Sequence, residues 1–117
     1  MPNMLIVEDD FFIATMLSEI MQDNGYDIAA VINNFDDATR FVADNTVDFA
    51  LLDYNIVGGT TIDIAKELMR KSVPLIILTG NTNDEALKEE LPDVVVLDKP
   101  FREALLLETI QSAIGAR

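Results

Sequence analysis

The sequence predicts one α/β domain built on a doubly wound parallel sheet. Short apolar runs alternate with amphipathic segments along the 117 residues, so strands and helices follow one another. Such βαβ units give a parallel sheet that is covered by helices on both faces. A chain of this length forms a single domain. We expect residues 1–117 to be that domain, with no output module attached.

The predicted strands are short apolar runs that end at turn or polar residues. They comprise residues 4–7, 28–32, 49–53, 75–79 and 94–97. A strand buried in a parallel sheet reads as a continuous apolar run. The third run is of this kind, because it stays apolar until it stops on Asp53.

The predicted helices gather apolar residues on one face. In residues 11–24, Phe12, Met16 and Ile20 recur at every fourth position, and Gly25 is a plausible stop. The helix at residues 84–91 has about two turns and is largely charged. The second helix is predicted to begin after the capping pair Asn33–Asn34, and the third after the capping residue Thr60 or Thr61. The last helix is predicted at residues 102–114.

Composition excludes several kinds of chemistry. The sequence has no histidine and no cysteine, so it has no histidine base, thiolate metal site or disulfide. Carboxylates, lysine, threonine and bound ions remain. The net charge of −13 argues against nucleic acid or an anionic membrane as a direct partner. No signal peptide or transmembrane segment is recognisable, and we expect a cytoplasmic location.

Polar residues gather where the predicted strands end. In a flavodoxin-like strand order of 2-1-3-4-5, the first and third strands are neighbours at the switch point where ligands bind. Taken singly, each residue also has a structural interpretation; an acid before a helix, for example, is most often an N-cap. The polar residues at these strand ends are Glu8, Asp9, Asp10, Asp53, Thr79 and Lys99.

The crowding of acids predicts a bound cation. Two carboxylates about 4 Å apart repel each other by roughly 4 kcal/mol at an effective dielectric constant near 20. Without histidine or cysteine the ligands are all oxygens, which suits a hard ion. We expect Mg²⁺, with Mn²⁺ or Ca²⁺ as substitutes.

This arrangement resembles the receiver domain of two-component response regulators, of the stand-alone single-domain type, over essentially the whole chain. Asp9 and Asp10 match the acidic pair that binds the metal in that family, and Asp53 matches its phosphoacceptor. Asn55 falls where the family lends a backbone carbonyl to the metal. The resemblance therefore implies a metal site made by Asp9, Asp10, Asp53 and Asn55.

The residues at the ends of the fourth and fifth predicted strands also match the family. Thr79 matches the switch hydroxyl of the family, and residues 99–101 match its Lys-Pro-Phe element, in which the Lys-Pro bond is commonly cis. The resemblance implies transfer of a phosphoryl group from a phosphohistidine of a kinase or phosphotransfer protein onto Asp53, with Thr79 and Lys99 assisting. Binding to a downstream effector would then change. Such a protein modifies itself and is not a turnover enzyme.

Three positions depart from the family pattern. Val57 and Thr61 stand where receivers often carry proline and glycine, and Val96 stands where many carry an aromatic switch residue. The family's aromatic readout is therefore unsupported here. We expect the output to involve reordering of residues 80–91.

Other interpretations stay open. Asp53 and Asn55 resemble the acid-x-acid of Mg²⁺-dependent haloacid dehalogenase phosphatases, although an amide replaces the second acid. A phosphorylation-independent pseudo-receiver is a further alternative, but such domains usually lose the acceptor or the acidic pair. The last helix has more apolar residues than one buried face needs. Either all are buried, or part of them forms a homodimer or partner surface with the fourth and fifth strands.

Overall fold

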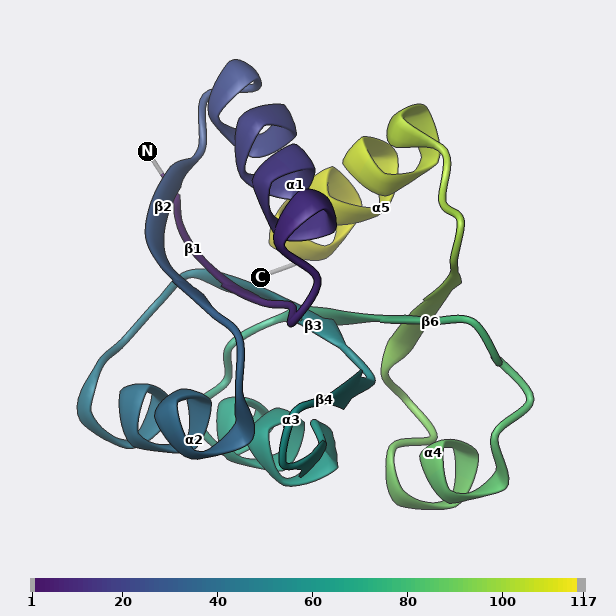
Figure 1. Cartoon of the computed structure of the whole chain (residues 1–117). Coiled ribbons are helices and arrows are strands. Elements are labelled where there is room, and N and C mark those ends of the chain that lie inside the picture. The colour runs from purple at the N-terminus through teal and green to yellow at the C-terminus, as the bar shows by residue number, and fades with distance from the viewer. Residues whose placement is uncertain (1, 116–117) are drawn as a thin grey trace.

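A five-stranded parallel sheet forms the centre of the computed structural model, which describes residues 2–115 (Figure 1). Its strands are β1 (Asn3–Val7), β2 (Asp27–Ile32), β3 (Phe49–Asp53), β6 (Leu75–Thr79) and β7 (Val95–Asp98). They lie in the order β2-β1-β3-β6-β7, and each neighbouring pair is parallel. The predicted flavodoxin-like fold and strand order are confirmed.

Within the described residues, five helices cover the two faces of this sheet. They are α1 (Phe11–Asp23), α2 (Phe35–Asp44), α3 (Ile62–Arg70), α4 (Glu85–Glu90) and α5 (Glu103–Gly115). α1 and α5 lie on one face, and α2, α3 and α4 lie on the other (Figure 1). The predicted ranges of the strands and helices differ from the observed bounds by no more than one residue.

Side-chain caps begin α1 and α2, whereas Thr61 stands at the cap position of α3 without a capping side-chain hydrogen bond. The Asp10 carboxylate accepts hydrogen bonds from the backbone N–H groups of Phe12 and Ile13, at 2.9 and 3.1 Å, and so begins α1. The Asn34 side chain accepts one from the N–H of Asp37 at 2.9 Å and begins α2. Because these caps satisfy N–H groups that the helix itself cannot pair, they fix where each helix leaves the sheet edge.

The segment after Asp53, predicted as a loop, is a short antiparallel hairpin. Its strands are β4 (Asn55–Ile56) and β5 (Gly59–Thr60). The Val57 carbonyl at the turn accepts a hydrogen bond of 2.9 Å from the N–H of Phe35. Gly58 has φ of +99°, and a side chain there would place its Cβ 3.0 Å from that of Phe35. The hairpin is therefore docked on the start of α2.

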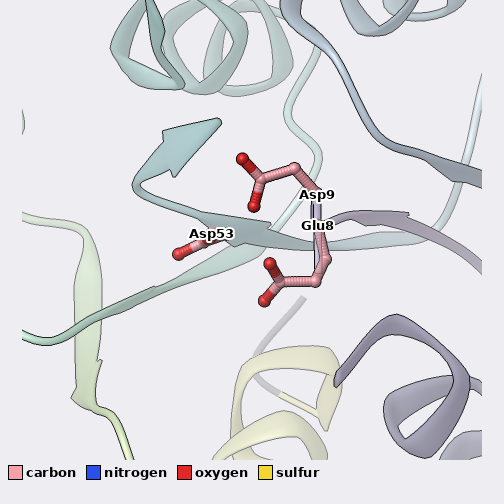
Figure 2. Close-up of side chains that lie close together, drawn as sticks. All are labelled: Glu8, Asp9 and Asp53. Carbon is pink, nitrogen blue, oxygen red and sulfur yellow. The ribbon is translucent and has the colours of Figure 1, made fainter. Parts of the chain in front are cut away.

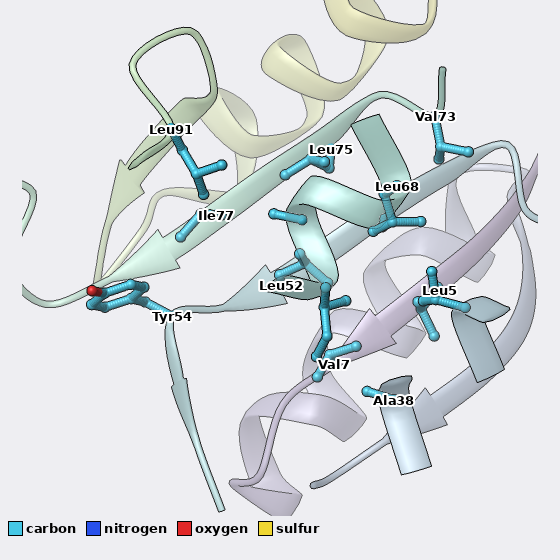
Figure 3. Close-up of a cluster of buried hydrophobic side chains, with 14 of the residues drawn as sticks. Leu5, Val7, Ala38, Leu52, Tyr54, Leu68, Val73, Leu75, Ile77 and Leu91 are labelled. Carbon is cyan, nitrogen blue, oxygen red and sulfur yellow. The ribbon is translucent and has the colours of Figure 1, made fainter. Parts of the chain in front are cut away.

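Apolar side chains of the sheet alternate between two clusters. Residues that point to one face of the strands pack with α1 and α5. Residues that point to the other face pack with α2, α3 and α4, and Figure 3 shows this second cluster. β3 is buried over its whole length, as is β6. Burying a large apolar side chain contributes about 1.5 to 3 kcal/mol. The central strands therefore form a rigid base for the residues at their carboxyl ends.

The last helix is only partly covered. Leu106 and Ile110 of α5 are buried, whereas Leu105 is 40% exposed. The surplus of apolar residues is thus not all buried, and the homodimer surface formed with β6 and β7 stays a prediction. Among residues 2–115, no helix is both long and apolar enough to cross a lipid bilayer.

Candidate functional site

Three carboxylates meet at the carboxyl ends of β1 and β3. Carboxylate oxygens of Glu8, Asp9 and Asp53 all lie within 4.8 Å of one another. Figure 2 shows these side chains beside the end of β3. The strand register explains the meeting, because Ile6 of β1 pairs with Leu51 of β3, and Glu8 and Asp53 each stand two residues further on. Side chains two residues apart point to the same face of a sheet.

Lys99, from the loop after β7, completes the cluster. Its Nζ atom lies 2.8 Å from Oε1 of Glu8 and 3.1 Å from Oδ1 of Asp53. Its backbone N–H donates to the Thr79 carbonyl at 2.8 Å, which fixes the loop against β6. The peptide bond between Lys99 and Pro100 is cis, so this part of the prediction is confirmed.

The electrostatics of the cluster follow from burial. Glu8 is 2% exposed and Asp53 is 9% exposed. Burial raises the pKa of Asp53 to about 7, and the Glu8 carboxylate adds to this rise while Lys99 opposes it. Burial alone would lower the pKa of Lys99, but Glu8 and Asp53 raise it. The positive charge of Lys99 therefore does not balance the combined negative charge of Glu8, Asp9 and Asp53. An all-oxygen donor set with excess negative charge fits a hard divalent cation.

Asp10 does not belong to the group that the structure brings together. Its carboxylate caps α1, while its own N–H donates to Oε2 of Glu8 at 3.1 Å. The prediction paired Asp9 with Asp10, whereas the structure pairs Asp9 with Glu8. The physical reason is that α1 begins at Phe11, which commits the preceding acid to capping. Met4 and Ile6 of β1 point to one face of the sheet, and continuing this alternation one step past the strand reaches Glu8.

The remaining predicted residues flank the cluster. Thr79 ends β6 and is 3% exposed, and its Oγ1 atom accepts a hydrogen bond of 3.1 Å from the N–H of Asn81. Asn55 begins β4, opposite Thr60, with an exposed side chain. Both residues lie one or two positions from the paired ends of β3 and β6, where Asp53 pairs with Leu78.

Sequence reasoning did not foresee the role of Thr61. This residue is fully buried, and its hydroxyl donates to the backbone carbonyl of Asp53 at 2.9 Å. Its N–H donates to the carbonyl of Tyr54, also at 2.9 Å. Thr61 thus ties the start of α3 to the end of β3. From the sequence, the position was predicted only as a possible helix cap and noted as a departure from the family pattern.

An apolar groove opens beside Lys99. Its volume is about 430 Å³, and its lining residues are Ile13, Met16, Ile20, Lys99, Pro100, Phe101 and Glu103. Phe11 and Phe12, at the start of α1, are 74% and 82% exposed, with ring centroids 5.8 Å apart. Exposed aromatic side chains beside an apolar groove are typical of a surface that binds another protein.

Comparison with known proteins identifies the family. Residues 4–111 match the family model of the response regulator receiver domain. The chain belongs to this family. Receiver domains are the signalling domains of two-component systems, and the resemblance predicted from Asp53, Thr79 and Lys99 is therefore confirmed at the level of the family.

Relatives of this receiver domain are response regulators. The DNA-binding response regulator MtrA of Mycobacterium tuberculosis is 31% identical over 115 residues, which cover 96% of this chain and 50% of that protein. The regulatory protein VirG of Rhizobium rhizogenes is 29% identical over 121 residues, which cover 100% of this chain and 50% of that protein. The chain spans about half the length of the curated relatives it matches.

Solved structures agree on the fold. The signal receiver domain of a modulated diguanylate cyclase from Desulfovibrio desulfuricans has a TM-score of 0.88 and 28% identity, with 99% of this chain and 95% of that chain covered. A CheY-like receiver domain protein from Methanospirillum hungatei has the same TM-score of 0.88 at 20% identity, with 99% and 95% covered.

Proposed function

We propose that this receiver domain accepts a phosphoryl group on Asp53 from a phosphohistidine of a histidine kinase or a phosphotransfer protein, and that the modification changes its binding to a downstream effector. The observation that carries the proposal is the placement of the Asp53 carboxylate. It lies 3.1 Å from the Lys99 ammonium and within 4.8 Å of two further carboxylates.

The proposed reaction needs positioning rather than a histidine base. An oxygen of the Asp53 carboxylate attacks the phosphorus, and an O–P bond forms as the P–N bond of the phosphohistidine breaks. The partner's imidazole keeps the electron pair of that bond and takes up a proton. Lys99 neutralises charge on the phosphoryl oxygens, and the Thr79 hydroxyl donates a hydrogen bond to one of them. Thr79 accepts from Asn81, so its proton can serve this purpose.

The acidic group fits a divalent metal ion. Glu8, Asp9 and Asp53, with the main-chain carbonyl of Asn55, would hold Mg²⁺, and Mn²⁺ or Ca²⁺ can substitute. When bound, the ion supplies positive charge that neutralises phosphoryl oxygens. Asp10, which the sequence placed among the metal ligands, keeps its capping role in this proposal.

The exposed apolar surface supports a protein as phosphodonor. The groove is lined by Lys99, Phe101 and residues of α1. Phe11 and Phe12, at the start of the same helix, are exposed. A histidine-bearing helical partner that covers this surface would bring its imidazole to the cleft at Asp53. The net charge of −13 favours a partner with a basic rim.

The test is loading of the phosphoryl group with a small-molecule donor. Incubation with acetyl phosphate and Mg²⁺ is expected to add the mass of one phosphoryl group to the wild type and to Asp93→Asn, an exposed acid remote from the site, but not to Asp53→Asn. Beryllofluoride, a mimic of the phosphoryl group, is expected to bind with the same pattern. Equal loading of Asp53→Asn and wild type would overturn the assignment. Sustained turnover of a phosphomonoester would instead indicate a phosphatase.

A further inference from the structure

Tyr54 directly follows Asp53, the proposed acceptor. It lies on the same face of the sheet as Val96, which stands at the position where many receivers carry an aromatic switch residue. Tyr54 and Val96 both belong to the apolar cluster beneath α2, α3 and α4. Figure 3 shows the Tyr54 ring at the end of β3. The residue is 5% exposed, so its ring is fixed by packing and only its hydroxyl reaches a polar partner.

That partner is the cap of α4. The Tyr54 hydroxyl donates to Oδ1 of Asp84 at 3.1 Å, and the same oxygen accepts from the N–H of Leu87 at 3.0 Å. α4 has only six residues, too few to be stable by itself, so it depends on this cap and on buried Leu87. One hydroxyl thus holds the start of a short helix against the strand that carries Asp53.

The loop between β6 and α4 is held at its other end by Thr79. The N–H of Asn81 donates to Oγ1 of Thr79 at 3.1 Å, and the N–H of Asp84 donates to the carbonyl of Asn81 at 3.3 Å. The ends of β3 and β6 are joined in the sheet, where the N–H of Tyr54 donates to the carbonyl of Leu78 at 2.9 Å. A movement of the Thr79 hydroxyl is therefore passed to Asp84 through two hydrogen bonds.

We propose that Tyr54 is the positioning residue that couples the state of Asp53 to α4, in the role that an aromatic residue at Val96 would otherwise fill. In the resting state its bond to Asp84 holds α4 on the sheet. When the Thr79 hydroxyl turns toward a phosphoryl group, the loop shifts, this bond is lost, and the α4 surface becomes available to a partner. The inference rests on the proposed function.

The test is hydrogen exchange of the backbone amides in residues 84–91, for wild type and Tyr54→Phe, without and with beryllofluoride and Mg²⁺. In the wild type, beryllofluoride is expected to speed this exchange about tenfold, the size expected for loss of one hydrogen bond to a charged group. Tyr54→Phe is expected to show the faster exchange already without beryllofluoride, and to change little when it binds. Tyr26→Phe, which alters the other tyrosine, is expected to behave as wild type.

The outcomes separate this inference from the proposed function. If Tyr54→Phe speeds exchange equally in both states and keeps the response to beryllofluoride, Tyr54 only stabilises the fold and the coupling is overturned. If wild type binds beryllofluoride and Tyr54→Phe exchanges as wild type does, the coupling is overturned while the phosphoacceptor function stands. If wild type does not bind beryllofluoride, both fail. Asp84→Asn keeps both acceptor contacts and is expected to retain the response.

Discussion

The ion pairs among residues 2–115 are either buried or exposed to solvent, and this difference in burial decides how much they contribute. Lys99 bridges Glu8 and Asp53 with side-chain exposures of 22%, 1% and 11%. The pairs between helical residues, such as Lys66 with Glu90 at 48% and 50% exposure, lie in solvent. Exposed pairs are screened by water and salt and contribute little. Among the ion pairs of residues 2–115, we therefore expect the buried cluster around Lys99 to affect stability, its pH dependence and ligand binding, and the exposed pairs to affect them little.

The largest expected effect is that of removing the buried ammonium. Lys99→Met leaves Glu8 and Asp53 without their counter-charge, and breaking a buried pair in this way costs about 3 kcal/mol. Urea denaturation at pH 8 measures this loss of unfolding free energy. Lys66→Met is the matched control and is expected to leave the unfolding midpoint unchanged. If Lys99→Met and Lys66→Met lowered the free energy of unfolding equally, the distinction between the buried and the exposed ion pairs would be wrong.

A smaller effect of opposite sign is expected for Asp53→Asn. The pKa of Asp53 in the folded protein, about 7, lies above the ordinary aspartate pKa of 3.8, so the folded protein holds this proton more tightly than the unfolded chain. The carboxyl therefore lowers stability progressively as pH rises from about 4 to about 7, and fully above that. The difference between these pKa values corresponds to at most about 4 kcal/mol, and solvent screening at the partly open site reduces it. Without added metal, the variant is therefore expected to be more stable by about 2 kcal/mol at pH 8 and almost unchanged at pH 4.

Thermal unfolding across this pH range checks the sign. A stabilisation that is the same at pH 4 and pH 8 would show that the gain comes from packing or hydrogen bonding and not from the charge of Asp53. Added Mg²⁺ is expected to stabilise the wild type more than the variant, because the carboxylate is then compensated.

The smallest effect on stability, but the sharpest on ligand binding, is expected for the acids at the end of β1. Glu8→Gln removes both the repulsion from Asp53 and the pair with Lys99, so stability is expected to change by less than about 1 kcal/mol. Affinity for Mg²⁺, measured by titration calorimetry, is expected to fall about tenfold or more, since a charged ligand is lost. Asp10→Asn, which retains a capping side chain, is expected to leave that affinity within about twofold. The reverse pattern would restore Asp10 as the ligand.

Much of the fold followed from pattern alone. The apolar runs are short and unbroken, and the helical segments carry one apolar face, so the elements and the ends of β3 and β6 were predictable. The strand order came from the flavodoxin-like topology taken for such βαβ units. The hairpin at residues 55–60 was not, because its two-residue strands are too short to have a periodicity. Its shape depends on the contact between Val57 and the start of α2.

Hydrophobic periodicity is a local property, so the sequence predicted the strands and helices and placed Asp53, Thr79 and Lys99 at strand ends. These strand ends share one edge because the sheet is parallel and has the flavodoxin-like strand order. The tertiary structure decided which of three consecutive acids faces Asp53, since that depends on strand register and on the residue where α1 begins. It also decided the link from Tyr54 to Asp84, thirty residues away. Contacts between segments so distant in sequence exist only once the sheet has placed them side by side.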